Sequence, residues 1–224
     1  MDLLWLYIYS YLVGAVPTAW VIPKLAKGVD LRRTGSGNVG GSNLYNLTGG
    51  AWLVPLALFE VFVKGASPIW IGIYVLGLDQ SPELLMIAPL LAIAGNNWPV
   101  FLRFQGGRGV SVGLGTLLVL APSVLGAFLA VGVIGWALTR NSGLWVMISL
   151  ALLPLWAYLS GGPLALVWYT GAMTGIVILK RLLTNDLSFP EGVPLRELLL
   201  NRLLLDRDTN DQAAWVQRAP ETSG

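Results

Sequence analysis

The chain has 224 residues, of which 55% are hydrophobic and 12% are charged, and its formal net charge is +2. A mean hydropathy of +0.67 is too high for an ordinary soluble domain, so the composition indicates an integral membrane protein and gives no reason to expect a nucleic-acid partner. The sequence has neither cysteine nor histidine, which excludes disulfides, thiolate and imidazole nucleophiles, the Ser-His-Asp triad and nearly all zinc chemistry.

Seven apolar segments along the chain predict an all-α, polytopic membrane protein. A helix of roughly 17 to 25 apolar residues crosses about 30 Å of hydrocarbon. The first segment is too long for the apolar core of a signal peptide and has no basic region before it, so we expect it to be retained. The predicted spans are residues 3–23, 52–76, 83–98, 110–120, 122–139, 144–159 and 163–179.

Within the second span, Glu60 and Lys64 are four residues apart and therefore share one face of a helix. Charged side chains inside a span either pair with each other or face a polar cavity. The order of glutamate before lysine is the favourable one on a helix. We interpret the pair primarily as a structural ion pair.

The region 110–139 can be read as one long span or as two shorter ones that turn near Pro122. With two spans, every lysine and arginine except Lys64 falls on one side of the membrane. The positive-inside rule makes that side cytoplasmic. We therefore expect seven transmembrane helices, with the N-terminus outside and the C-terminus in the cytoplasm.

A run of small and polar residues, Gly35-Ser36-Gly37-Asn38-Val39-Gly40-Gly41-Ser42-Asn43, lies between the first two spans. Glycines allow successive backbone N–H groups to converge on one point, which is how a backbone nest binds an anion. The plain alternative is a flexible loop between spans. Four basic residues precede the run: Lys24, Lys27, Arg32 and Arg33.

A second glycine run, Gly106-Gly107-Arg108-Gly109, follows the third span and falls on the same predicted side of the membrane. Convergence of cationic side chains and free N–H groups at a membrane surface suits a phosphate-bearing substrate. Only Asp30 provides a carboxylate close to the first run, so we expect no metal ion and no cofactor.

The C-terminal part differs in composition from the spans. Leucines at 195, 198, 199 and 203 recur at helical spacing among polar residues. This spacing predicts a short amphipathic helix that lies on the membrane face or docks on the bundle. We expect a polar, disordered end from Asp206, with Trp215 as an anchor, and we divide the chain into a membrane domain, 1–184, and a cytoplasmic tail, 185–224.

Several segments of the chain resemble the motifs of a known family. The segments Tyr11–Pro17 and Asp30–Asn43 resemble the start of the bacterial acyl-phosphate:glycerol-3-phosphate acyltransferases. Gly95–Phe101 together with Phe104–Val110 is similar to the second motif of that family, and Lys180–Leu183 to the end of its third. The similarity keeps the same order and spacing from Tyr11 to Leu183 and includes Lys64-Gly65.

The resemblance implies a multi-pass enzyme of the inner (cytoplasmic) membrane that acts in phospholipid biosynthesis. Members of the family transfer a fatty acyl group from acyl phosphate to the 1-hydroxyl of glycerol 3-phosphate and form lysophosphatidic acid. Acyl phosphate is a mixed anhydride, already activated for attack, and its departing phosphate can accept the proton. The protein then has to hold two anionic substrates together and stabilise developing charge, which needs no histidine.

The resemblance also suggests roles for residues in the two glycine runs. The candidates for catalysis are Ser36, Asn38 and Arg108; Ser36 is assigned a hydrogen-bonding role because no base is present to activate it as a nucleophile. Lys180 and Arg181 are interpreted mainly as anchors at the membrane interface, with Lys180 as a possible aid to binding. The candidates for substrate binding are Gly35, Gly37, Gly40, Asn43, Asn96, Gly106, Gly107, Gly109 and Lys180.

Two other functions are weighed against the enzyme. The first is a catalytically impaired paralogue that binds lipid or phosphate intermediates, because Asn96 replaces a histidine of the family and Gly175–Ile178 lacks the polar groups of its third motif. The second is a small transporter, supported only by Glu60 and Lys64. An odd number of spans without inverted repeats disfavours transport.

Overall fold

The computed structural model describes residues 1–34, 37–185 and 193–209, and all regular elements in these ranges are helical, as predicted. The helices are α1 (Asp2–Ala15), α2 (Thr18–Lys27), α3 (Gly41–Thr48), α4 (Leu53–Leu58), α5 (Ser67–Trp70), α6 (Pro82–Leu85), α7 (Ile87–Asn97), α8 (Val110–Leu120), α9 (Pro122–Thr139), α10 (Ser142–Leu159), α11 (Leu164–Leu182) and α12 (Leu195–Leu205). Two π-helical segments, η3 (Phe59–Ala66) and η4 (Ile71–Val75), continue α4 and α5, and short 3₁₀ turns η1 (Leu31–Arg33), η2 (Gly50–Trp52), η5 (Leu78–Gln80) and η6 (Val100–Leu102) lie in the connections.

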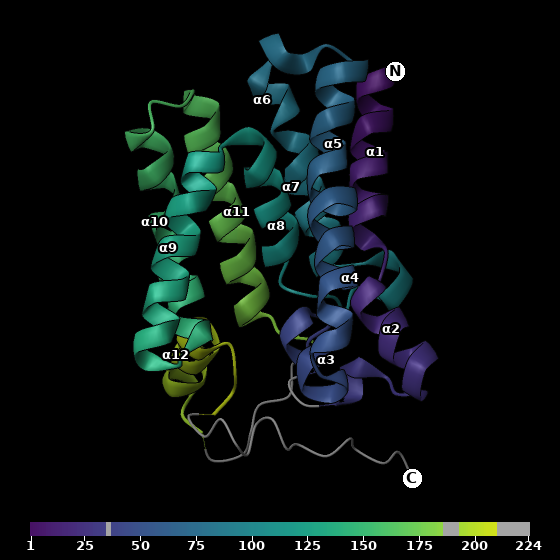
Figure 1. Cartoon of the computed structure of the whole chain (residues 1–224), viewed down its shortest axis with the longest axis vertical. Coiled ribbons are helices and arrows are strands. Elements are labelled where there is room, and N and C mark those ends of the chain that lie inside the picture. Colours follow the sequence, from purple (N-terminus) through teal and green to yellow (C-terminus); the bar gives the residue numbers. More distant parts are fainter. Residues whose placement is uncertain (35–36, 186–192, 210–224) are drawn as a thin grey trace.

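The long helices run side by side, and the short ones gather at the ends (Figure 1). The N-terminus and α6 lie at one end of the bundle, whereas α2, α3 and α12 lie at the other. The main packed pairs are α1 with α7, α8 with η3, α9 with α10, and α10 with α11. The end that carries α2 and α3 also receives the connection between α7 and α8, which contains the second glycine run.

Five helical stretches in the described chain are long and apolar enough to cross a membrane. The other two predicted spans correspond to α8, a shorter apolar helix, and to α11, which has 19 residues. The five stretches are Asp2–Lys27, Gly50–Val75, Pro82–Leu102, Pro122–Thr139 and Ser142–Leu159. These observations support a multi-pass membrane protein, while the exact number of crossings and their direction stay predictions.

Two prolines mark breaks between helices. Ala121, with φ −155° and ψ 73°, separates α8 from α9, and Pro122 then begins α9. Proline suits this first helical position because its missing N–H would have no partner there. The region 110–139 therefore forms two helices with a break at Ala121, next to the predicted turn at Pro122. In the first predicted span, Pro17 lies between α1 and α2, so that segment is a broken helix rather than a continuous one.

The helix pair formed by η3 and α8 is unusually close. A Cβ atom added to Gly65 would lie 2.5 Å from the carbonyl oxygen of Val112, and one added to Gly115 would lie 2.1 Å from that of Val61. Glycine is required at both positions because any side chain would collide with backbone. Such small residues allow membrane helices to approach closely, and this contact places the polar face of η3 against the start of α8.

The helix predicted in the C-terminal part is confirmed as α12, which docks on the bundle. Leu198 is buried there, and α12 packs against α10 and α11. The Arg181 guanidinium at the end of α11 donates to the carbonyls of Gly143, 3.1 Å, and Leu203, 2.7 Å. Residues 210–224, including Trp215, lie outside the described part of the chain. The polar stretch between the first two predicted spans contains the helix α3.

Candidate active site

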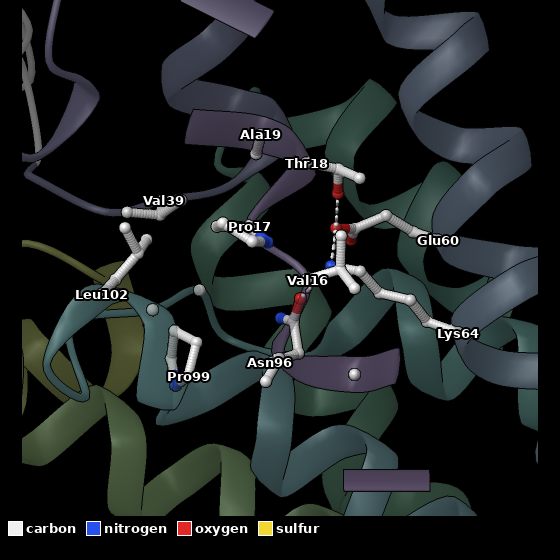
Figure 2. A pocket seen from close by; sticks show the side chains of 14 residues that line it. Val16, Pro17, Thr18, Ala19, Val39, Glu60, Lys64, Asn96, Pro99 and Leu102 are labelled. Atoms are coloured by element: carbon white, nitrogen blue, oxygen red, sulfur yellow. Dashed lines mark hydrogen bonds and ion pairs between the residues drawn. The ribbon is translucent and has the colours of Figure 1, made fainter. Parts of the chain in front are cut away.

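A buried polar network joins the second and third predicted spans. The Lys64 ammonium donates to Glu60 Oε1 and to Asn96 Oδ1, each at 2.9 Å (Figure 2). All three side chains are buried, and Lys64 is only 1% exposed. A charge inside a span needs an opposite charge and further hydrogen bonds to offset its lost hydration. The ion pair is therefore confirmed, and it also reaches a residue of the second motif.

Two hydroxyl groups complete the surroundings of the Glu60 carboxylate. Thr18 Oγ1 donates to Oε1 at 3.1 Å, and the Ser111 hydroxyl donates to Oε2. Four elements, α2, η3, α7 and α8, thus contribute to one network. Within the described residues, the Lys64 ammonium uses two of its three N–H bonds, so the third is available to a substrate oxygen.

The network lines a pocket that forms where α1 and α7 end and α2 begins (Figure 2). The pocket is partly open to the outside of the protein, and its empty space, including the solvent at its mouth, is about 200 Å³. Its wall combines charged, amide and hydroxyl side chains with glycine backbone. The lining residues are Gly14, Ala15, Val16, Pro17, Thr18, Ala19, Val39, Glu60, Lys64, Asn96, Pro99, Leu102, Gly106 and Gly107.

The second glycine run is packed directly against the end of α7 and the first run. The Gly107 N–H donates to the carbonyl of Asn96 at 2.9 Å. A Cβ atom on Gly106 would lie 2.2 Å from that carbonyl oxygen, and one on Gly107 would lie 2.6 Å from the carbonyl oxygen of Val39. Only glycine fits, because the neighbouring atoms belong to backbone. Gly109, with φ +73°, then turns the chain into α8.

The first glycine run is shaped from within by Asn43. Its buried Nδ2 donates to the carbonyls of Leu31, 3.1 Å, Thr34, 2.9 Å, and Asn38, 3.1 Å. Asn43 therefore organises the loop through three backbone carbonyls. Gly37 has φ +65°, and Gly40 precedes the first residue of α3. Gly35 and Ser36, both predicted site residues, lie outside the described residues.

Asp30 stabilises the approach to the first run. Its carboxylate accepts from the Arg32 guanidinium at 2.6 Å and from Trp20 Nε1 at 2.8 Å. The Arg32 hydrogen bonds lower the pKa of this carboxyl to about 2, against the opposing effect of its partial burial. Asp30 is therefore ionised throughout the physiological range, and it fixes the Arg32 guanidinium in place.

Arg108 has a different environment from the pocket residues. Its Nε donates to Asp206 at 2.8 Å, and its Nη1 donates to the carbonyl of Lys180 at 2.7 Å. These contacts tie the second glycine run to the end of α11 and to the residue that follows α12. Arg108 is not among the residues that line the pocket.

Lys180 and Arg181 are buried side chains, with 1% and 2% of their surface exposed. Their interpretation as anchors at the membrane interface is therefore wrong. Both lie at the end of α11, where α12 and the loop at Asn185 cover them. Lys180 Nζ lies 5.5 Å from the centre of the Trp98 ring and donates to Asn185 Oδ1 at 2.8 Å.

Several polar residues near the site were missed as functional candidates. Glu60 and Lys64 gave a signal, because a charged pair within a span calls for an explanation. Thr18, Ser111 and Asn185 gave none, since single hydroxyl and amide groups are common in any sequence. Their positions become meaningful only when distant segments come together.

The fold and the pocket define a class: a polytopic, helical membrane protein with a charged and glycine-lined site at one end of its bundle. A family model described as "Glycerol-3-phosphate acyltransferase" matches residues 4–185. The chain belongs to this family, which confirms the resemblance of its motifs.

Curated relatives and solved structures agree. The chain is 36% identical over 218 residues to "Glycerol-3-phosphate acyltransferase 5" of Dehalococcoides mccartyi, covering 94% of this chain and 91% of that protein. It is 38% identical over 189 residues to "Glycerol-3-phosphate acyltransferase" of Rubrobacter xylanophilus, covering 84% and 91%. It also resembles crystal structures of the integral membrane enzyme PlsY (YgiH). The glycerol 3-phosphate form has a TM-score of 0.74 and 30% identity, with 81% of this chain and 88% of that one covered.

Proposed function

We propose that this glycerol-3-phosphate acyltransferase takes its acyl group from acyl phosphate and transfers it to the 1-hydroxyl of glycerol 3-phosphate, which yields lysophosphatidic acid for phospholipid synthesis. The family match and the named relatives carry the acyltransferase activity. The two similar PlsY structures are described as a glycerol 3-phosphate form and a lysophosphatidic acid form, which supports these two molecules as substrate and product.

One observation carries the proposal for where this happens: the pocket at which the buried Lys64 network meets the backbone of the second glycine run. A lysine N–H and backbone amides are suitable donors for phosphate and carbonyl oxygens. Burial strengthens such donors because little water competes with them. Lys64 therefore joins the residues proposed to contact substrate.

The reaction balances without a protein nucleophile. The 1-hydroxyl oxygen of glycerol 3-phosphate forms a bond to the acyl carbonyl carbon, and the bond from that carbon to the phosphate oxygen breaks. The departing phosphate keeps the electron pair and takes the hydroxyl proton. The protein supplies orientation and donors for the negative charge that develops on the carbonyl oxygen.

The roles proposed for the glycine runs follow the motifs. Ser36 and Asn38 are assigned hydrogen bonds to one phosphate and Arg108 an ionic contact to the other, through the guanidinium N–H bonds that Asp206 and Lys180 do not use. Asn96 positions Lys64. The remaining binding candidates are Gly35, Gly37, Gly40, Asn43, Gly106, Gly107, Gly109 and Lys180. Asn43 contributes through the loop that it shapes, because its side-chain N–H groups already donate to three carbonyls.

We further propose seven crossings, with the N-terminus outside and the C-terminus in the cytoplasm of the inner membrane. Apart from Lys64, the basic residues then lie on the cytoplasmic side. The pocket would open to that side, where both soluble and lipid-like substrates are within reach. The boundary between the membrane domain, 1–184, and the tail, 185–224, is part of this proposal.

The donor is tested by acyl transfer with purified protein in detergent. Acyl phosphate and radiolabelled glycerol 3-phosphate are supplied, with acyl-CoA as a control donor in a parallel reaction. We expect labelled lysophosphatidic acid with acyl phosphate and none with acyl-CoA. Product with acyl-CoA alone would overturn the proposed donor, and the absence of product with either donor from folded protein would contradict the activity.

A further inference from the structure

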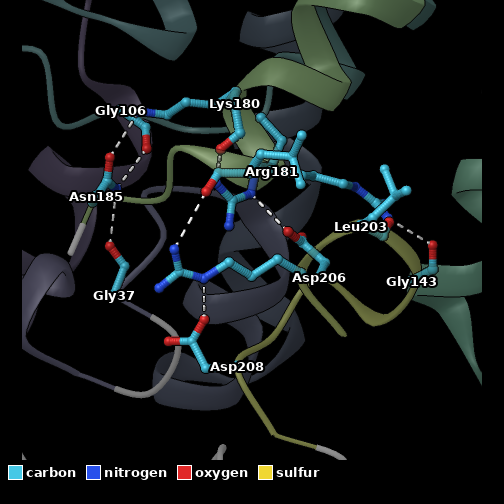
Figure 3. A network of polar contacts seen from close by, with 12 residues as sticks. Gly37, Gly106, Gly143, Lys180, Arg181, Asn185, Leu203, Asp206 and Asp208 are labelled. Atoms are coloured by element: carbon cyan, nitrogen blue, oxygen red, sulfur yellow. Dashed lines mark hydrogen bonds and ion pairs between the residues drawn. The ribbon is translucent and has the colours of Figure 1, made fainter. Parts of the chain in front are cut away.

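The side chain of Asn185 lies between the two glycine runs, just beyond α11 (Figure 3). Its Nδ2 donates to the carbonyl of Gly37 at 3.1 Å and to that of Gly106 at 2.9 Å. Its Oδ1 accepts from Lys180 Nζ at 2.8 Å. One amide therefore bridges segments that are 148 and 79 residues away in the sequence.

The partners fix which way this amide faces. Both backbone partners are carbonyls, which only accept, and the Lys180 ammonium only donates. The reversed orientation would place Oδ1 against two carbonyl oxygens and the NH₂ group against the ammonium. The network therefore allows a single orientation, in which both N–H bonds of Asn185 are used.

This contact sets the direction of two peptide groups. In a planar trans peptide, the carbonyl and the following N–H point to opposite sides. The carbonyl of Gly106 points to Asn185, so the N–H of Gly107 points away from it, where it donates to the carbonyl of Asn96. By the same geometry, the carbonyl of Gly37 directs the N–H of Asn38 away from Asn185.

Glycine peptides rotate easily, because no Cβ atom restricts them. A glycine loop that lines a substrate pocket, as Gly106 and Gly107 do, has to be held in one arrangement before the substrate arrives. Asn185 is the described side chain that contacts both runs at once through their carbonyls.

We propose that Asn185 is a positioning residue for acyl transfer, which fixes the peptide groups at Gly37 and Gly106 and so holds the two loops in the arrangement that shapes the substrate pocket. It acts through the backbone of Gly37 and Gly106. The inference rests on the proposed function, and it adds a residue that lies outside both glycine runs.

The test compares three variants of the full-length protein in the acyl phosphate assay. Asn185→Ala removes both donors. Asn185→Asp keeps the shape and the acceptor for Lys180, but turns a negative oxygen toward two carbonyls. Asn185→Gln keeps the donors on a side chain one methylene longer. Gln80→Glu provides the matched amide-to-carboxylate control, because Gln80 is exposed and lies two residues before α6, which is at the opposite end of the bundle from α2 and α3.

We expect kcat/KM to fall by about 100-fold in Asn185→Ala and at least as far in Asn185→Asp, because a small misplacement of bound substrates costs about this much. Asn185→Gln is expected to recover part of the rate, and Gln80→Glu all of it. The temperature of thermal unfolding in detergent is measured for each protein, and we expect it to change little.

If the wild type is active, two results would overturn the inference. One is a kcat/KM of Asn185→Asp equal to that of the wild type. The other is a rate in each variant that falls only in proportion to its fraction of folded protein. An inactive but folded wild type would instead overturn the proposed function. Asn185→Ala introduces no buried charge, so it can be compared with the wild type even if Asn185→Asp does not fold.

Discussion

Two ion pairs show how differently charged residues are used in this protein. The pair of Lys64 and Glu60 lies inside the helix bundle, borders the pocket and continues to Asn96. The pair of Arg108 and Asp206, at 2.8 Å, lies where the second glycine run meets the residue after α12. The sequence favoured Arg108 as a substrate contact and the Lys64 pair as a structural one. In the structure, Lys64 lines the pocket and Arg108 holds the C-terminal part.

The difference follows from burial and from the partners available. A lysine inside a span is tolerated only when it is paired. Because even a paired charge is costly there, such a lysine usually serves a function. The Arg108 pair is less completely enclosed, with 10% of the Arg108 side chain and 25% of the Asp206 side chain exposed, and a backbone carbonyl also accepts from the guanidinium. The burial of a charged side chain and its position at the pocket therefore predict a role in the site better than its residue type does.

The largest expected effect concerns the enclosed pair. Lys64→Met leaves the Glu60 carboxylate buried without its cation, which typically costs about 3–5 kcal/mol. We expect a strongly lowered unfolding temperature in detergent and no detectable acyl transfer. The double variant Lys64→Met/Glu60→Gln removes both charges and should recover most of the stability. If Lys64→Met is as stable as the wild type, the Lys64–Glu60 pair is not buried away from water.

The next effect concerns the close approach of the second glycine run. Gly106→Ala would bring a Cβ atom to 2.2 Å from a backbone oxygen of Asn96, so the loop has to move. We expect kcat/KM to fall by about 100-fold, in line with the cost of misplaced groups. Gly126→Ala is the matched control, because a Cβ atom at this position of α9 meets nothing within 4 Å. Equal rates for both variants would show that the loop geometry does not control activity.

The peripheral ion pair can be separated from substrate binding by two variants. Asp206→Asn removes the partner of Arg108 and leaves the guanidinium intact, whereas Arg108→Ala removes the guanidinium. If Arg108 contacts a phosphate, only Arg108→Ala raises KM, by about 10-fold or more for a charged hydrogen bond. The measurement is KM for each substrate. Equal effects of the two variants would mean that Arg108 serves the C-terminal contact alone.

The smallest effect is expected at Asp30. Its pKa of about 2 lies below the ordinary 3.8, so the stabilisation from its ionised form is complete above about pH 4 and is lost as the pH falls through 2. Between pH 5 and 9, this group should add no pH dependence to stability or rate. A pH titration of unfolding temperature for wild type and Asp30→Asn checks this, and a difference that varies within that range would contradict it.

The fold was largely predictable because hydropathy and charge can be read from consecutive residues, without knowing which distant segments come together. Apolar length identified the five helical stretches that are long enough to cross a membrane, and the one-sided distribution of basic residues predicted the turn at Pro122. The break at Pro17 was missed, although a proline between two helical stretches is a local signal. The helix α3 was hidden by its small polar residues, which also suit a loop.

The site was predictable only in part. The two glycine runs were identified from composition, and the close approach of the backbone of Asn96 and Val39 explains why positions 106 and 107 are glycine. The network around Glu60 draws residues from four elements, and helical periodicity relates residues only within one element. The contacts of Asn185 span 148 and 79 residues, so no local pattern foretells them.

The most direct test of the central claim is the rate of lysophosphatidic acid formation by Lys64→Met/Glu60→Gln, measured with acyl phosphate and glycerol 3-phosphate beside the wild type. The account predicts a folded protein with an unfolding temperature close to that of the wild type and kcat/KM at least about 100-fold lower, since a preorganised donor in a buried site is worth this much. A wild-type rate from this variant would contradict the account, because the enclosed pair would then be structural and the reaction would occur elsewhere.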